Sequence, residues 1–290
     1  MSLLTRYLKL INVEYRTARQ QGYTVRSIYR AALPWIVKRP IYQTQQLPIN
    51  VYYFSCDRDL PEQVASIRSF IRHVGIPDKF TVVSDGSYSP ASCQLLRQIN
   101  PCVEVVDFAR FIKKNLPPCV YAYASIHPLG KKLAVLISLP VDKVTMYADS
   151  DILFFSGAEK LLKITGSSDL RPRYLLDCAT ALDERLLDKA SENFAPVNSG
   201  FMVVQKPLDW EIPLKRLAQL REPANYFTEQ TSLHLAMHYN QGVPLSPEQF
   251  VVNRDDEFIY QDRHCSRKVA LRHYVSPIRH KFWFHPGLGK

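Results

Sequence analysis

The sequence has little glycine, no closely paired cysteines and no long apolar run. Its ten glycines and twenty prolines are spread over 290 residues without a period, which excludes collagen-like and linker-dominated chains. No GxGxxG motif follows a predicted strand, which disfavours a dinucleotide-dependent oxidoreductase. Because 46% of the residues are hydrophobic and 22% are charged, the chain can bury a substantial core. We therefore expect a globular protein.

The cysteine pattern and the short apolar runs bear on where the protein works. None of the six cysteines belongs to a CxxC pair, which disfavours a zinc site and a disulfide framework and is typical of reduced thiols. No apolar run approaches the roughly 18 to 20 residues of a membrane-spanning helix, and the N-terminus lacks the pattern of a signal peptide. We therefore expect a cytoplasmic protein that is neither secreted nor membrane-spanning.

Positive charge concentrates in residues 1–47, which we expect to form a helical arm. The chain carries a net charge of +10, and residues 1–40 contribute eight basic residues against one acid, Glu14. Apolar side chains recur at helical spacing among these charges, which predicts basic amphipathic helices. Such helices could lie on an anionic membrane surface, or they could pack on the domain that follows. The apolar residues of the pattern are Leu4, Leu8, Ile11, Tyr15, Val25, Ile28, Tyr29, Ala32 and Trp35.

Residues 49–148 alternate between strand-like and helix-like segments. Residues 49–56 are rich in β-branched and aromatic residues, as buried strands are. A segment with helical apolar spacing runs from Pro61 to Val74, and a second predicted strand ends at Asp85. This alternation predicts an α/β fold with a mainly parallel central sheet flanked by helices. Ligands of such sheets bind beyond the carboxyl ends of the strands.

Two Asp-x-Asp patterns occur, at Asp57/Asp59 and at Asp149/Asp151. Chance alone predicts about one such pattern in this composition, so the context has to decide. Asp149 and Asp151 follow the apolar strand VTMYA and precede the apolar run ILFF, which places two carboxylates at the end of a buried strand. A divalent cation would offset the cost of burying them, because Mg²⁺ and Mn²⁺ prefer carboxylate oxygens and can bridge to a diphosphate. A pair of exposed turn aspartates is the alternative.

Four segments carry the motifs of a known enzyme group. They are GKKLAVLISLP, YADSDILFF, PVNSGFMVVQK and TEQTSLHLAMH. In this order they resemble the GT-A glycosyltransferases, particularly the glycogenin and bacterial galactosyltransferase-like group, glycosyltransferase family 8. The first resembles a helix that presents a basic residue to the donor, the second a metal-binding strand end, the third an Asn-Ala/Ser-Gly segment, and the fourth an Asp-Gln helix start.

The resemblance implies a fold, an activity and a set of ligands. The fold would be GT-A, with a nucleotide-sugar-binding half at residues 48–165 and an acceptor-binding half at residues 166–290, whose C-terminal tail would close over phosphates. The activity would be transfer of a sugar from a nucleoside-diphosphate sugar, with retention, to a glycan, lipid-linked or protein acceptor. Mn²⁺ or Mg²⁺ would be the cofactor, and no nucleic acid is expected as a partner.

The resemblance also implies roles for individual residues. Asp149, Asp151 and His273 would bind the metal, although the C-terminal segment lacks the glycine that follows the family's histidine. Asn198 would contact the sugar, and Gly200 would let the backbone approach it closely. The implied catalytic residues are Asp149, Asp151, Asn198, Glu229 and Gln230, and the implied donor-binding residues are Asp59, Asp85, Lys132, Arg279 and Lys281.

Several of these residues also have a purely structural interpretation. Asp59 and Asp85 could be Asx-turn residues at the ends of strands. Glu229 could be a favourable acid in the first turn of a helix. Arg279 and Lys281 could be solvated surface charges, although phosphates need cationic partners.

Two other classes of function fit parts of the sequence. A haloacid dehalogenase-like phosphoryl-transfer enzyme also uses Asp-x-Asp after an apolar strand, and Asp255 and Asp256 could be its later acidic pair. That family has Thr or Val four residues after the first Asp, however, where this chain has Leu153. The pI of about 9.3 and the basic arm fit a non-catalytic module that binds nucleic acid or a membrane, but no nucleic-acid-binding motif supports it.

Overall fold

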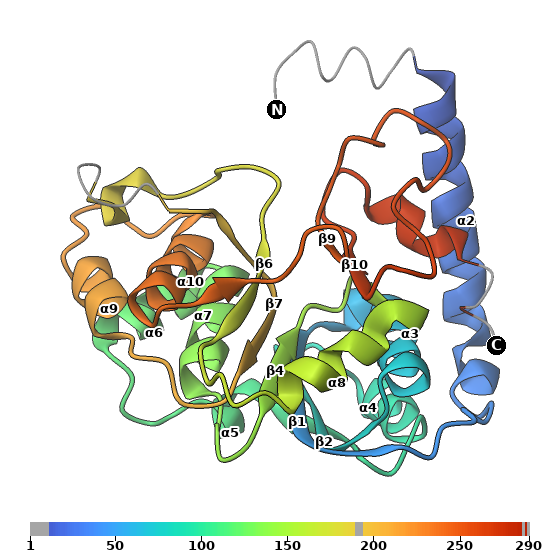
Figure 1. Ribbon diagram of the computed structural model, residues 1–290, viewed down its shortest axis with the longest axis horizontal. Helices are drawn as coiled ribbons and strands as arrows, with labels where there is room; N and C mark the ends of the chain where they lie inside the picture. Colours follow the sequence, from blue (N-terminus) through green and yellow to red (C-terminus); the bar gives the residue numbers. More distant parts are fainter. Residues whose placement is uncertain (1–11, 189–193, 286–287, 289–290) are drawn as a thin grey trace.

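A seven-stranded sheet forms the centre of the protein (Figure 1). The structure is a computed structural model and describes residues 12–188, 194–285 and 288. Strands β3, β2, β1 and β4 are parallel neighbours in this order, β7 is antiparallel to both β4 and β6, and β8 is parallel to β6. The predicted mainly parallel sheet is confirmed. The strands are β1 (Gln46–Ser55), β2 (Ile76–Ser84), β3 (Val103–Asp107), β4 (Thr145–Ala148), β6 (Arg173–Leu176), β7 (Val197–Val204) and β8 (Val243–Pro244).

Helices cover both faces of this sheet. Val51 and Tyr53 of β1 belong to the apolar core that includes α2, α3 and α4, whereas Tyr52 belongs to the core that includes α6, α7 and α10. Successive side chains of a strand point to opposite faces, so β1 has to be apolar on both sides. The helices are α2 (Val13–Ile36), α3 (Leu60–His73), α4 (Pro90–Arg97), α5 (Phe108–Phe111), α6 (Pro118–Ile126), α7 (Pro128–Ser138), α8 (Lys160–Thr165), α9 (Glu211–Ala218) and α10 (Thr228–Tyr239), with the 3₁₀ helices η1 (Asp57–Asp59), η2 (Ser156–Glu159), η3 (Glu184–Leu186) and η4 (Arg279–Phe284).

A second, three-stranded sheet follows the end of β4. Its middle strand β10 (Leu271–His273) pairs antiparallel with β5 (Ile152–Phe154) and parallel with β9 (Phe250–Val251). The register places His273 opposite Ile152, the residue directly after Asp151. This small sheet therefore brings a side chain from the far end of the chain to the turn after β4.

The basic arm contains a 24-residue helix, α2, that packs on the domain. Tyr29 and Leu33 are buried in the same apolar core as α3 and η4. Arg26 donates two hydrogen bonds to the Glu62 carboxylate of α3, at 2.6 and 3.0 Å. Packing on the following domain, one of the two arrangements left open by the sequence, is therefore observed for this helix.

The predicted apolar face of the arm is divided between the core and the surface. Tyr29 is buried, but Ile28 and Trp35 are 63% and 69% exposed. Leu4, Leu8 and Ile11 lie outside the described residues. Within residues 12–188 and 194–285, no helix is both long enough and apolar enough to span a bilayer.

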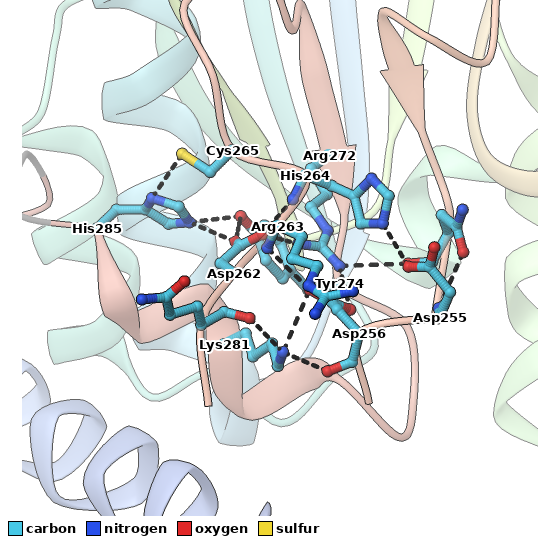
Figure 2. Close-up of polar contacts among 12 residues, drawn as sticks. Asp255, Asp256, Asp262, Arg263, His264, Cys265, Arg272, Tyr274, Lys281 and His285 are labelled. Carbon is cyan, nitrogen blue, oxygen red and sulfur yellow. Dashed lines mark hydrogen bonds and ion pairs between the residues drawn. The ribbon is translucent and has the colours of Figure 1, made fainter. Parts of the chain in front are cut away.

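The C-terminal segment differs from the predicted loop over phosphates. Phe282 and Trp283 of η4 lie in the apolar core. Lys281 is fully buried, and its Nζ donates to the carbonyl oxygens of Asp256 and Gln261, at 2.5 and 2.8 Å (Figure 2). This contradicts the prediction that Lys281 binds the donor. Successive side chains of a 3₁₀ helix point about 120° apart, so Arg279 and Lys281, two residues apart, point in different directions.

We predict that Asp256→Ala lowers the free energy of unfolding by about 3–5 kcal/mol, because it leaves the buried Lys281 ammonium without its carboxylate and removes one of the two carboxylates that bind Arg272, the other being Asp262. Asp255→Ala is the matched control. The Asp255 carboxylate is 59% exposed beside His264, so its loss should cost less than about 1 kcal/mol. Urea denaturation measures both values, and equal losses would show that the buried network does not hold this segment in place.

Candidate functional site

A pocket of about 330 Å³ lies at the carboxyl end of β4. Its walls come from distant parts of the chain, including α7, the β4–β5 turn, β7, the start of α10 and the segment from β10 to η4. Three residues proposed from the sequence, Asp59, Asp85 and Lys281, do not line it. Those that line it are Lys132, Asp149, Asp151, Asn198, Glu229, Gln230, His273 and Arg279.

Asp149, Asp151 and His273 form a compact group of potential metal ligands. One ligand atom from each lies within 4.8 Å of the others. Nε2 of His273 is 3.1 Å from Oδ1 of Asp151 and 3.8 Å from Oδ2 of Asp149. Two carboxylates and an imidazole suit Mn²⁺ in particular, since Mg²⁺ prefers oxygen ligands alone. The structure thus assembles the three residues that the sequence proposed as ligands.

Asn198 fixes the orientation of the His273 imidazole. Its Oδ1 is 2.8 Å from Nδ1 of His273 and also accepts a hydrogen bond from the Gly200 N–H, while its Nδ2 donates to Asp177. Because an amide oxygen only accepts, Nδ1 must carry a proton, and Nε2 is left facing the aspartates. Asn198 was predicted to contact the sugar, and here its whole amide is engaged in orienting this histidine.

Gly200 is required by the position of the same imidazole. A Cβ atom at Gly200 would lie 2.2 Å from Cε1 and 2.3 Å from Nδ1 of His273, distances that real Cβ contacts do not show. The sequence predicted that Gly200 permits a close approach of the backbone to a sugar. In the structure, the group that approaches the backbone is His273.

Lys132 is buried behind Asp149. Its Nζ donates to Oδ2 of Asp149 at 2.8 Å and to Oγ of Ser199 at 3.1 Å, and lies 3.8 Å from Oε1 of Glu229. Burial alone would lower the pKa of Lys132, but the two carboxylates outweigh burial and raise it. Tyr147 donates to the other oxygen of Asp149 at 2.8 Å. Lys132 and Tyr147 together hold Asp149 in one orientation.

Glu229 is a buried acid at the start of α10. Its Oε2 accepts a hydrogen bond from Ser199 at 3.1 Å, whereas its buried Oε1 has no hydrogen-bond partner among the described residues. Burial raises the pKa of Glu229 to about 7, and the nearby Lys132 ammonium reverses only part of this rise. Gln230 follows it, and its amide donates to Asp177 at 3.2 Å.

Arg279 joins the metal-ligand group to the edge of the pocket. Its Nη2 is 3.1 Å from Oδ1 of Asp59, and its Nε is 3.6 Å from Oδ2 of Asp151. Burial opposes ionisation of Asp151, but Arg279 and His273 outweigh it and lower the pKa of Asp151. Asp85 is not part of this group, since its carboxylate accepts from the N–H and the hydroxyl of Ser87 as in an Asx turn.

Sequence reasoning missed other residues of the pocket, among them Asp177, Tyr226, Phe227 and Arg254. Asp177 follows directly after β6, so its place at a strand end was a signal of the kind that identified Asp149. Tyr226 and Phe227 directly precede α10 and are exposed, at 65% and 41%. Nothing in the local sequence around Arg254 indicated that its loop reaches the pocket.

Several solved glycosyltransferase structures share this architecture. The galactosyltransferase LgtC, in complex with donor and acceptor sugar analogues, matches with a TM-score of 0.51 and 15% identity over 79% of this chain and 87% of its own. Mouse xyloside xylosyltransferase 1 matches with a TM-score of 0.52 and 12% identity, over 81% and 99% of the two chains. The bifunctional glycosyltransferase WbbM matches with a TM-score of 0.53 and 16% identity, over 82% of this chain and 47% of its own.

These likenesses establish the fold of the chain. No protein-family model and no curated protein matches the sequence. At 12–16% identity, structural similarity is evidence about architecture, and function has to be argued from the site. The chain therefore has the GT-A fold of glycosyltransferases, as the sequence predicted.

We predict that Gly200→Ala weakens Mn²⁺ binding by about 10- to 100-fold, because the added methyl group displaces the His273 imidazole. Gly166→Ala is the matched control, since its Cβ would meet no atom closer than 3.4 Å. Mn²⁺ titration followed by electron paramagnetic resonance measures the affinities. Wild-type affinity in a folded Gly200→Ala variant would contradict this account of the glycine.

We predict that Glu229→Gln makes the stability of the metal-free protein less dependent on pH. The pKa of Glu229 is raised from 4.5 to about 7 in the folded protein, so its stabilising contribution is complete below pH 4.5 and is lost as the pH rises through 7. The total change is on the order of 3 kcal/mol.

The free energy of unfolding in urea, measured from pH 4.5 to 8 for wild type and Glu229→Gln, tests this expectation. The wild type should lose stability relative to the variant over that range. Glu222→Gln is the control, because the Glu222 carboxylate is 77% exposed. Parallel curves for wild type and Glu229→Gln would contradict the raised pKa.

Proposed function

We propose that this protein is a metal-dependent glycosyltransferase that uses a nucleoside-diphosphate sugar as its donor. The observation that carries the proposal is the Asp149, Asp151 and His273 group, assembled in the pocket of a GT-A fold. Its two carboxylates and oriented imidazole fit Mn²⁺ best, with Mg²⁺ as the alternative. The bound cation would neutralise charge on the departing nucleoside diphosphate.

Two cationic side chains of the pocket, Lys132 and Arg279, would have different roles. Lys132 is only 6% exposed and is bound to Asp149, so we assign it the role of holding that carboxylate in place. The Arg279 side chain is 34% exposed and lies next to Asp151, where it can bind a phosphate oxygen. Asp59 and Asp85 follow the ends of β1 and β2, and we propose that the nucleoside binds beside them.

We propose further that transfer proceeds with retention, as the resemblance to family 8 implies. An inverting enzyme needs a carboxylate base on the acceptor side of the sugar. Among the described pocket residues, Asp177 is engaged by the amides of Asn198 and Gln230, and Glu229 is buried against Ser199. This leaves Gln230 as our candidate for the far side of the anomeric carbon. The acceptor would be a glycan, a lipid-linked sugar or a protein.

The phosphoryl-transfer alternative finds no support in the site. Asp255 and Asp256 were the candidates for its later acidic pair. Neither residue lines the pocket, and Asp256 is bound to Arg272 and Lys281 at 2.9 and 3.2 Å.

We predict that Asp149→Asn and Asp151→Asn each lower kcat by at least about 1000-fold and weaken metal-dependent nucleotide binding, while the protein stays folded. Donor hydrolysis, measured with a panel of nucleotide sugars with and without Mn²⁺, reports the activity. Chelation of the metal should abolish wild-type turnover, and added Mn²⁺ should restore it.

The other Asp-x-Asp motif supplies the control. Asp57 is bound to Arg30 and Ser92 and does not line the pocket, so Asp57→Asn should have a much milder effect on turnover. Near-normal, metal-dependent turnover in folded Asp149→Asn or Asp151→Asn would refute the metal-site assignment.

A further inference from the structure

Helix α2 carries exposed apolar side chains that its packing on the domain does not use. Val13, Ile28 and Trp35 are 72%, 63% and 69% exposed. With 3.6 residues per turn, these three positions fall on one side of the helix, with the exposed Ala31 between the last two and the polar Thr17 and Thr24 between the first two. The helix lies along one edge of the molecule (Figure 1). We call Val13, Ile28, Ala31 and Trp35 the outer ridge.

Basic residues lie near both ends of the outer ridge, with Arg16 one turn from Val13 and Lys38 and Arg39 beyond Trp35, whereas Arg30 binds Asp57 of the domain. The exposed charged residues of the described arm, residues 12–47, comprise five bases and one acid, Glu14. Lys38 and Arg39 directly follow the Trp35 end of the ridge, and the exposed Tyr42 lies just beyond them in sequence. The five bases are Arg16, Arg19, Arg30, Lys38 and Arg39.

We propose that the outer ridge docks this protein on an anionic lipid surface. Exposed tryptophan and isoleucine flanked by Arg16, Lys38 and Arg39 match the interfacial region of a bilayer, where the rings and aliphatic chains enter the headgroup layer and Lys and Arg contact lipid phosphates. A second copy of the chain is a poorer occupant, because a two-fold contact through this face would bring like charges together.

The packing of α2 makes this surface a rigid one. Arg26 binds Glu62, and Arg30 binds Asp57 at 2.8 Å, so ion pairs join the helix to α3 and η1 in addition to its apolar contacts. Docking would therefore hold the pocket in a fixed orientation to the lipid surface. This inference does not depend on which reaction the pocket performs, although a fixed orientation would suit a lipid-linked acceptor.

Vesicle flotation of the full-length protein tests the proposal. The vesicles are pure phosphatidylcholine or phosphatidylcholine with 30% phosphatidylglycerol, each at low and high salt. We expect binding to the anionic vesicles only, weakened by salt. The double variant Ile28→Ser/Trp35→Ser should bind at least about tenfold more weakly. Ile126→Ser/Leu170→Ser, at positions 61% and 51% exposed elsewhere, is the control and should bind like wild type.

A second pair of variants separates local charge from net charge. Arg16→Glu/Lys38→Glu should weaken binding about tenfold, whereas Lys114→Glu/Lys206→Glu, with the same change in net charge at exposed positions elsewhere, should not. Trp35 also gives a direct signal, because Trp210 and Trp283 are buried. Its fluorescence should shift to the blue on binding anionic vesicles.

Four outcomes would overturn the proposal. One is equal vesicle binding by wild type and Ile28→Ser/Trp35→Ser. Another is binding that does not depend on anionic lipid. The third is a dimer in analytical ultracentrifugation that the same double substitution abolishes, since this would assign the outer ridge to a second copy of the chain. Salt-sensitive binding to RNA in place of vesicles would assign the basic residues to a different polyanion.

Discussion

The contact between the His273 imidazole and the backbone at Gly200 is the constraint on which the pocket depends. The imidazole occupies the space that a side chain at position 200 would fill. Asn198, two residues earlier on the same strand, accepts a hydrogen bond from Nδ1 of His273. Strand β7 therefore provides both the space and the hydrogen bond. With the ring fixed through Nδ1, its other nitrogen, Nε2, faces the aspartates after β4. The third ligand is positioned by the sheet itself.

Charge balance is the second constraint on the pocket. Asp149, Asp151 and Glu229 place three acids in a largely buried region, where isolated carboxylates are costly. Lys132 and Arg279 stabilise the first two as anions, while burial shifts Glu229 towards its neutral form. The same pocket thus holds two carboxylates bound by cations and a third acid whose pKa burial raises.

The C-terminal segment supplies two groups of the pocket, and a buried ionic network fixes its path. Asp256 binds Arg272 of β10 and Lys281 of η4, both fully buried (Figure 2). Arg272 is next to His273, and Lys281 is two residues from Arg279. The network that buries Lys281 away from the pocket therefore also positions His273 and Arg279 in the pocket wall. Ion pairing and hydrogen bonding offset the desolvation cost of these buried charges. Removing one partner would leave the other charges without that compensation and destabilise the fold.

The sequence by itself determined the features that are set locally. Runs of β-branched and aromatic residues predicted β1 and β2, helical apolar spacing predicted α3, and the apolar runs around Asp149 and Asp151 distinguished that motif from Asp57 and Asp59. The resemblance to family 8 proposed further residues, and only the tertiary structure decided which of them join Asp149 and Asp151. The antiparallel pairing of β10 with β5 spans more than a hundred residues, and the turn of η4 sends Arg279 to the pocket and Lys281 to the core. Those outcomes depend on which surfaces become buried together, and the spacing of residues along a chain carries no information about that choice.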